Sequence, residues 1–251
     1  MNKHSVFYHL EVLPTINDLN IAAAEFIIAT AKKAIAKRGR FVISFSGGQT
    51  PLELYSILSQ SPFREQIEWE RTFIFWGDER CVPLEDKRNN AHQAKITLLN
   101  EVNIPPSNIH IIPVNLPPSE AAKKYEKEIN DFFGVGPRQF DLILLGLGEN
   151  GHTASLFPGT KILNEQAEGV REVYVEEEKN FRITMTAPLI NQSHHILFLV
   201  TGKNKAEILE NIMWAPYQPQ KYPAQLIKPL EGDLRWFADS AAATPVLLRG
   251  L

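Results

Sequence analysis

Residues 141–159 read DLILLGLGENGHTASLFPG, and this stretch decides both the fold class and the candidate chemistry of the chain. The apolar run 142–145 predicts a buried strand, which stops at the first of three closely spaced glycines. His152 follows the third glycine directly, and histidine is the side chain whose ordinary pKa best suits proton transfer near neutral pH. We therefore expect a strand that feeds a tight loop presenting His152.

Residues 146–151 also match the G-x-G-x-x-G pattern of dinucleotide-binding folds. Such a site needs its third glycine, here Gly151, to open a long helix that packs on the sheet. Pro158 and Gly159 follow too soon to allow such a helix. The pattern therefore favours a loop over a nicotinamide or flavin site, and we expect no cofactor.

The composition is that of an ordinary soluble enzyme, with 251 residues, of which 44% are hydrophobic and 22% charged. No apolar run approaches the roughly 20 residues of a membrane span, and the N-terminal residues Asn2, Lys3, His4 and His9 interrupt any secretory core. We expect a cytoplasmic protein with no membrane partner. The net charge of −3 offers no overall attraction for nucleic acid, so any anion site must be local.

The cysteine count limits the chemistry further. Cys81 is the only cysteine, which excludes intramolecular disulfides and cysteine-rich zinc sites. His194 and His195 could pass for a metal pair, but adjacent side chains at a strand start point to opposite faces. We expect both histidines to be structural and no metal to be bound.

Apolar runs alternate with helical stretches along the chain, which is typical of a mostly parallel α/β sheet with helices on both faces. The expected strands are residues 41–45, 72–76, 109–112, 142–145, 173–175, 181–185, 196–200 and 234–237. The expected helices are residues 19–37, ended by Gly39, and residues 51–59, 90–99, 120–133 and 203–213. We predict a single domain, 1–251, because no linker or repeat divides it; the proline-rich segment 216–229 is expected to be an ordered surface excursion.

A second motif, FSGGQTP at residues 45–51, lies between an expected strand and an expected helix. Thr50 and Glu53 have the spacing of a capping box, and Pro51 suits the first helical position. The two glycines allow backbone amides to turn toward an anion at the positive end of the helix. The segment lacks the lysine of the nucleotide-binding P-loop, so it favours a monophosphate. A plain strand-to-helix turn is the alternative.

Two groups of charged residues follow other expected strands. Asp78, Glu79 and Arg80 come directly after the run 72–76, where open α/β sheets place their ligand crevice; a solvated charged loop is the alternative. Basic residues occur again in the last third, at Arg182, Lys203 and Lys205. Each such residue is individually more typical of a surface charge, but together they can complete a phosphate site that backbone amides begin.

Six segments together resemble one family. They are 46–51, 77–80 with Val82, Pro83 and Asn90, 146–159, 182–191, 202–206, and 222–224 continuing through 236–242. In type and order they resemble the 6-phosphogluconolactonase family, over about residues 46–242. The most specific motif is GHTASLFPG at 151–159.

The same superfamily contains glucosamine-6-phosphate deaminases, in which a Phe-Asn-Glu type sequence after the histidine supplies a carboxylate. Residues 153–158 here read TASLFP and contain no carboxylate, so the resemblance favours the lactonases. One departure is Asn150, at a position where relatives often carry Asp. Asn150 can orient the loop through hydrogen bonds, but it brings no negative charge to raise the basicity of His152.

The resemblance implies a single-domain, modified Rossmann-like fold and metal-free hydrolysis of 6-phospho-D-glucono-1,5-lactone to 6-phosphogluconate in the oxidative pentose phosphate pathway. Such a hydrolase has to position a water, take its proton and stabilise an oxyanion. We assign His152 as general base and Asp78 as the group that orients substrate hydroxyls or the imidazole. The expected substrate- and phosphate-binding residues are Ser46, Gly47, Gly48, Thr50, Arg80, Asn150, Arg182 and Lys205. The Gly47 and Gly48 amides are candidates for either phosphate or oxyanion contacts.

Two rival functions come from other classes. One is an aminosugar-phosphate isomerase or deaminase, which the missing carboxylate disfavours. The other is a catalytically silent sugar-phosphate sensor, which the presence of His152 and Asp78 disfavours. The expected partner is the small sugar-phosphate lactone, and the expected assembly is a monomer or weak homodimer.

Overall fold

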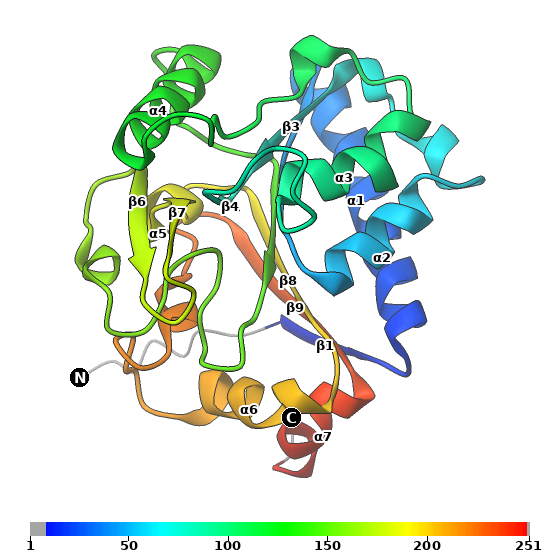
Figure 1. Ribbon diagram of the computed structural model, residues 1–251. Helices are drawn as coiled ribbons and strands as arrows, with labels where there is room; N and C mark the ends of the chain where they lie inside the picture. The colour runs from blue at the N-terminus through cyan, green and yellow to red at the C-terminus, as the bar shows by residue number, and fades with distance from the viewer. Residues whose placement is uncertain (1–8, 250–251) are drawn as a thin grey trace.

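The computed structural model of the chain describes residues 9–249 (Figure 1). Asn2, Lys3 and His4, which enter the expectation of a cytoplasmic protein, lie outside the described residues. Within the described part, no helix is long and apolar enough to cross a membrane.

Six parallel strands form the central sheet, in the order β1-β9-β8-β5-β2-β3. Their bounds are β1 His9–Leu13, β2 Phe41–Phe45, β3 Thr72–Trp76, β5 Leu142–Gly146, β8 His195–Val200 and β9 Asp233–Asp239. Every residue of β2 is buried, as are the first four of β5. Burial of central parallel strands on both faces explains why they read as continuous apolar runs.

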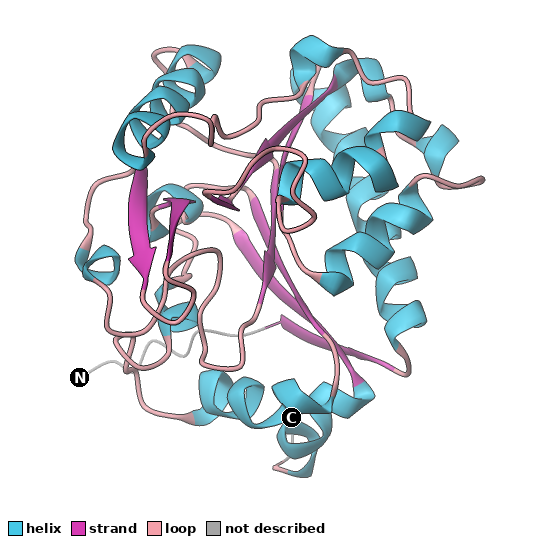
Figure 2. Ribbon diagram, in the orientation of Figure 1, coloured by secondary structure: helices cyan, strands magenta, loops and turns pink. Residues whose placement is uncertain are grey.

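Helices cover this sheet, and their bounds are α1 Ile16–Arg38, α2 Gln49–Leu58, α3 Asn90–Thr97, α4 Pro118–Phe133, α5 Ala187–Ile190, α6 Ala206–Trp214 and α7 Ser240–Leu248. Helices α1, α2 and α3 lie to the right of the sheet in Figure 1, and α4 lies to the left. Helix α1 ends at Gly39 in the left-handed conformation, as the sequence predicts. The α/β class with a mostly parallel sheet is confirmed (Figure 2).

A second, antiparallel sheet was not expected. It has the order β4-β7-β6, with bounds β4 Asp78–Arg80, β6 Val170–Val175 and β7 Asn180–Met185. The apolar runs 173–175 and 181–185 therefore belong to a hairpin and not to the main sheet, because the four-residue turn between β6 and β7 is too short for a parallel crossover. Its register places Arg80 opposite Arg182.

Two further expectations need correction. Residues 109–112 do not form a strand: only Ile109 makes an isolated bridge, to Ile74. Prolines at 105, 106 and 113 flank this run and cannot donate to a ladder. The segment 216–229 is ordered but is only in part a surface excursion, since Tyr222, Ala224 and Ile227 are buried.

Apart from Val82, the buried apolar side chains of the described residues form one cluster that extends from α1 to α7 and includes both sheets. Val170 of β6 and Ile183 of β7 belong to the same cluster as Ile143 of β5. A shared core of this kind supports the proposal of one domain over residues 1–251.

Candidate active site

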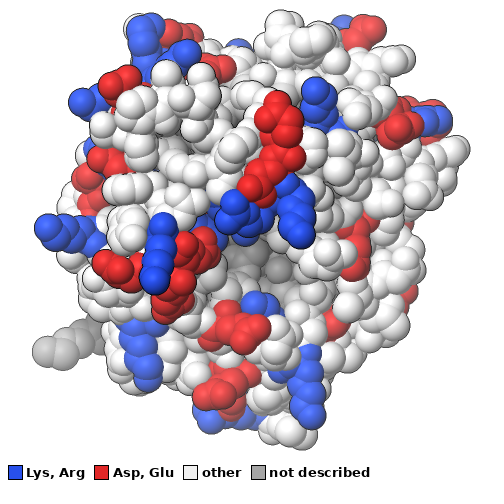
Figure 3. All heavy atoms as spheres, viewed as in Figure 1, with Lys and Arg blue, Asp and Glu red and all other residues white. Residues whose placement is uncertain are grey.

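A pocket of about 440 Å³ opens at the carboxyl ends of β2, β3, β5 and β8, the edge where α/β sheets place ligands. Figure 3 shows a hollow on this face with Lys and Arg side chains on its rim. Nine of the ten predicted site residues line the pocket: Ser46, Gly47, Gly48, Thr50, Asp78, Arg80, His152, Arg182 and Lys205. The tenth, Asn150, does not line the pocket, but its Oδ1 contacts Nδ1 of the His152 imidazole.

The loop between β2 and α2 presents unpaired backbone donors. Gly48 adopts φ 107°, a conformation that favours glycine, and precedes the first helical residue. The N–H groups of Gly47 and Gly48 donate to no acceptor among residues 9–249. Unpaired amides at the start of a helix favour an anion, because the partial positive charge of the helix dipole lies there.

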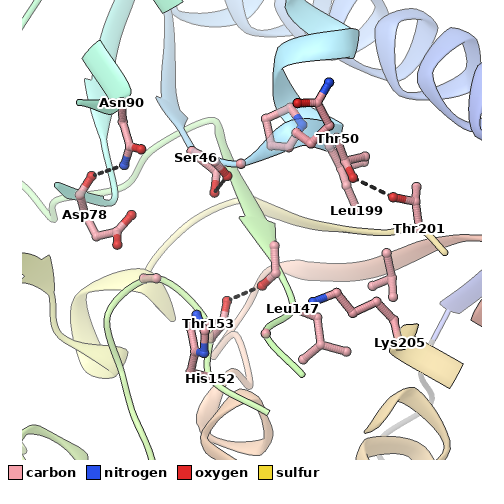
Figure 4. A pocket seen from close by; sticks show the side chains of 18 of the residues that line it. Ser46, Thr50, Asp78, Asn90, Leu147, His152, Thr153, Leu199, Thr201 and Lys205 are labelled. Atoms are coloured by element: carbon pink, nitrogen blue, oxygen red, sulfur yellow. Dashed lines mark hydrogen bonds between the residues drawn. The ribbon is translucent and has the colours of Figure 1, made fainter. Parts of the chain in front are cut away.

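The capping box predicted for this helix is wrong. Gly48 is the N-cap, and no side chain caps the helix. The hydroxyl of Thr50 instead lies 2.6 Å from the hydroxyl of Thr201, which follows β8 (Figure 4). This contact ties the start of α2 to the neighbouring strand end. Glu53 accepts from Gln49 and not from the cap position, because the helix begins one residue before Thr50.

The loop after β5 holds His152 against the pocket. In this loop, the backbone N–H of Gly148 donates to the carbonyl of His152 at 2.8 Å, and the Thr153 hydroxyl donates to the Gly146 carbonyl at 2.9 Å. The imidazole stacks on the Phe157 ring with a centroid separation of 4.1 Å. No helix follows Gly151 directly, so the predicted loop after this glycine is confirmed.

The protonation of His152 is set by Asn150. The backbone N–H of His152, which can only donate, points to Asn150 Oδ1 at 3.2 Å, so this atom is the amide oxygen. The imidazole Nδ1 lies 2.6 Å from the same oxygen and must therefore carry a proton. In the neutral ring, Nε2 then keeps its lone pair and can accept a proton.

The surroundings of His152 favour the neutral ring. Burial lowers its pKa from 6.5 to about 4, and the nearby positive charge of Arg182 acts in the same direction, while Asp78 acts against both. Burial and like charge both disfavour the imidazolium.

Asp78 is fixed by three neighbours and is 5% exposed. Its Oδ2 accepts a 2.5 Å hydrogen bond from the Ser155 hydroxyl and lies 3.5 Å from Arg182 Nη1. The Asn90 side-chain amide donates to the Asp78 carbonyl at 3.0 Å (Figure 4). The partner of the imidazole Nδ1 is Asn150, so Asp78 does not orient the ring through that nitrogen.

Glu79 organises the adjacent start of α3. This side chain is 1% exposed and accepts from the backbone N–H groups of Arg80, Asn90 and Ala91, with donor–acceptor distances of 2.8 to 3.0 Å. Burial raises its pKa to about 7, although these hydrogen bonds oppose the shift. The Asn90 carboxamide in turn accepts from the Arg80 guanidinium. Glu79 thus positions the residues that hold Arg80 at the rim.

The two predicted phosphate ligands, Lys205 and Arg182, differ in whether they already make ion pairs within the protein. Lys205 extends its ammonium toward the centre of the pocket (Figure 4) and makes no ion pair within residues 9–249. Burial lowers its pKa. Arg182, by contrast, pairs with Glu178 and Asp78. Lys203 lies exposed outside the pocket.

Sequence reasoning missed several residues at the site. Ser155 and Phe157 lie inside the conspicuous 151–159 motif but carry no recognisable catalytic spacing, and Thr201 follows β8 without any motif. His195 lies 3.6 Å from Asp233 at the opposite end of β8 from the pocket, in keeping with a structural role. Among the described residues, no three His, Cys, Asp or Glu side chains are grouped as metal ligands.

The sequence of this chain is similar to those of known proteins. Residues 14–236 match the family model described as glucosamine-6-phosphate isomerases/6-phosphogluconolactonase. A 6-phosphogluconolactonase of Synechocystis is 42% identical over 215 residues, which is 84% of this chain and 86% of the relative.

Solved structures agree with the match. The crystal structure of the devB protein superposes with a TM-score of 0.88 at 32% identity, over 96% of this chain and 100% of that one. The 6-phosphogluconolactonase of Thermotoga maritima gives a TM-score of 0.79 at 29% identity, over 92% and 99%.

The fold and the pocket define an α/β protein whose carboxyl-edge pocket is lined by His152, basic side chains and unpaired helix-start amides. The chain belongs to the glucosamine-6-phosphate isomerase/6-phosphogluconolactonase family.

Proposed function

We propose that this chain is a 6-phosphogluconolactonase, which hydrolyses 6-phospho-D-glucono-1,5-lactone without a metal ion and with His152 as general base. The observation that carries the proposal is the 2.6 Å contact of His152 Nδ1 with Asn150 Oδ1, which leaves Nε2 as the acceptor on a ring that lines a pocket shared with Lys205 and the unpaired amides of Gly47 and Gly48. The 34–42% identical lactonases among its relatives support the choice of substrate.

The reaction needs one proton carrier. Nε2 of His152 takes a proton from a water as the water oxygen attacks the lactone carbonyl carbon. The bond from that carbon to the ring oxygen then breaks, and the imidazolium returns the proton to the ring oxygen, which becomes a hydroxyl. The products are the neutral imidazole and the open-chain carboxylic acid, which loses its proton to solvent and becomes the carboxylate.

The two ends of the substrate need different contacts. Basic side chains and helix-start amides suit the phosphate and the oxyanion, which are both negative. Lys205 enters the pocket from the short 3-10 helix η6 (Lys203–Lys205), and Arg80 enters it from strand β4. Asp78, held by Ser155, is an acceptor that suits sugar hydroxyls.

The deaminase alternative requires a carboxylate shortly after the histidine. From that stretch, Thr153 and Ala154 line the pocket, and the Ser155 hydroxyl donates to Asp78; none of these is a carboxylate. No observation favours ammonia release or a silent sensor over hydrolysis.

The function is tested by adding the purified chain to freshly generated 6-phosphogluconolactone and measuring acid release above the spontaneous rate. An accelerated rate supports the proposal, and an unchanged rate contradicts it. A parallel assay for ammonia release from glucosamine-6-phosphate should be negative. Sedimentation measurements check the expected monomer or weak homodimer, and cell fractionation checks the expected cytoplasmic location.

We expect lactonase activity to survive exhaustive treatment with a chelator. The reason is that no tetrahedral ligand set is grouped among the described residues, and the proposed steps need only proton transfer. The measurement is the rate before and after dialysis against EDTA. Loss of activity, with recovery upon addition of a divalent ion, would refute metal independence.

We expect the acid limb of the pH profile of kcat/KM to lie near pH 4, well below that of an ordinary histidine. His152 is a base only while neutral, so activity is kept above its pKa of about 4 and is lost as the pH falls through that value.

The substitution Asn150→Asp tests the cause. A carboxylate at the 2.6 Å contact would stabilise the imidazolium and move the acid limb upward by about one to three pH units. Asn150→Ala removes the acceptor without adding charge and should lower kcat without that upward shift. If Asn150→Asp does not shift the acid limb of the kcat/KM profile, the assignment of His152 as general base is contradicted.

We expect Lys205→Ala to raise KM for the phosphorylated lactone by about 10- to 100-fold, since a charged hydrogen bond contributes about 1.5 to 3 kcal/mol. KM for unphosphorylated gluconolactone should change far less. Lys203→Ala is the matched control, because this neighbouring lysine lies outside the pocket. Equal losses with both lactones would show that Lys205 serves the chemistry or the fold instead. Arg182→Ala should show the same selectivity for the phosphorylated lactone.

A further inference from the structure

The guanidinium of Arg182 is already occupied by a carboxylate in this structure. Its Nε donates to Glu178 Oε2 at 3.1 Å, and its Nη2 donates to Glu178 Oε1. The side chain of Arg182 is 7% exposed, and its guanidinium lies 5.3 Å from the centroid of the Phe157 ring. Two parallel hydrogen bonds from one guanidinium edge are the geometry that phosphate would also use.

The two carboxylates beside Arg182 differ in how firmly they are held. Asp78 is buried and also accepts from Ser155. Glu178 lies on the turn 176–179 between β6 and β7, its side chain is 39% exposed, and its carboxylate accepts only from Arg182 among the described residues. Glu178 can therefore leave Arg182 by a side-chain rotation into solvent, whereas Asp78 cannot.

The electrostatic surroundings keep Glu178 ionised. Burial acts to raise its pKa, but the hydrogen bonds and charge of Arg182 outweigh burial and leave the pKa below its ordinary value. A second hollow next to the main pocket is lined by Glu178 together with Arg80, Lys87, Arg88 and Arg182. Among the described residues that line this hollow, Glu178 is the only carboxylate beside four basic side chains, and it occupies the guanidinium edge that an anion would use.

We propose that Glu178 tunes phosphate affinity at this site, as an internal anion that a substrate phosphate must displace from Arg182. The inference rests on the proposed function, because it assumes that Arg182 serves phosphate binding. A neutral or weakly held ligand leaves the Glu178–Arg182 pair intact, whereas a phosphate dianion can replace both hydrogen bonds. The pair thus lowers the affinity of the Arg182 site for phosphate and leaves the affinity for a neutral ligand unchanged.

The test is the affinity for inorganic phosphate, measured by calorimetric titration of the parent chain and of Glu178→Gln. The neutral amide competes less well for the guanidinium, so phosphate should bind about two- to fivefold more tightly, the range of a partly exposed ion pair. Glu177→Gln is the matched control: it removes one negative charge from the same turn, but Glu177 is exposed and, among the described residues, makes no ion pair or hydrogen bond with Arg182. Its affinity for phosphate should equal that of the parent.

The outcomes separate this inference from the proposed function. Tighter phosphate binding by Glu178→Gln alone supports it, together with a lower KM for the phosphorylated lactone relative to the unphosphorylated one. Unchanged binding overturns it, as does equal tightening in the Glu177 control or the absence of phosphate binding in both proteins. Weaker binding also overturns it and would make Glu178 a positioning residue for Arg182. The titration needs no turnover, so it remains decisive even if the chain hydrolyses no lactone.

Discussion

Replacing His152 by alanine or asparagine is expected to lower kcat by about 10²- to 10⁴-fold, the usual contribution of a positioned general base, while KM changes little. The ring lines the pocket and stacks on Phe157 at its edge, so its removal should leave the core intact. The measurement is kcat and KM for the phosphorylated lactone, with circular dichroism to show that the variants are folded.

Asp78→Asn provides the comparison for this prediction. Asp78 is held by Ser155 and Arg182 and should act on substrate hydroxyls, so its loss should cost less than the loss of His152. If the His152 variants keep near-parent rates while Asp78→Asn is inactive, the base is Asp78. The same result would contradict the assignment made from the Nδ1 contact to Asn150.

Gly148→Ala is expected to lower kcat by about 10²-fold although it alters no chemical group, because misplacing a catalytic group by about 1 Å costs that much. A Cβ at position 148 would lie 2.1 Å from both Cε1 and Nδ1 of His152. The imidazole would have to move, and its hydrogen bond to Asn150 would be lost. KM should change little, since Gly148 carries no group that binds phosphate.

The control for a general effect of glycine replacement is Gly136→Ala, where the nearest atom would be 3.8 Å from the new Cβ. That variant should keep the parent kcat. The double variant Gly148→Ala/His152→Ala should be no slower than His152→Ala alone, because both changes act through one side chain. Additive losses would show that Gly148 acts independently of His152.

Local patterns made much of the fold readable. The apolar runs of β2, β3, β5 and β8 were predicted within one or two residues, because strands buried on both faces allow few other residue types. Helix α1 was predicted with its Gly39 end for a similarly local reason, the left-handed conformation that glycine adopts at low cost. The elements β4 and α5 were missed because three and four residues are too few for a period to be visible. Strand β1 was missed because it lies at the sheet edge and is not a buried apolar run, and α7 because Pro245 interrupts its pattern.

Some features of the candidate site were also readable from local sequence, and others were not. The sequence alone determined that His152 follows a glycine loop at a strand end and that the amides of Gly47 and Gly48 precede a helix, because these features depend on neighbours within a few residues. The contact of Asn150 with His152 is equally local, at a separation of two residues.

Only the tertiary structure decided what surrounds these groups. The Ser155–Asp78 hydrogen bond joins residues 77 positions apart, and the β4–β7 register brings Arg80 opposite Arg182. The carbonyl of Gly151 accepts from Ala224, in a segment that the sequence assigned to the surface. Such pairings depend on how the second sheet and the loops pack on one core, a balance of burial and backbone hydrogen bonding that no short window of sequence contains.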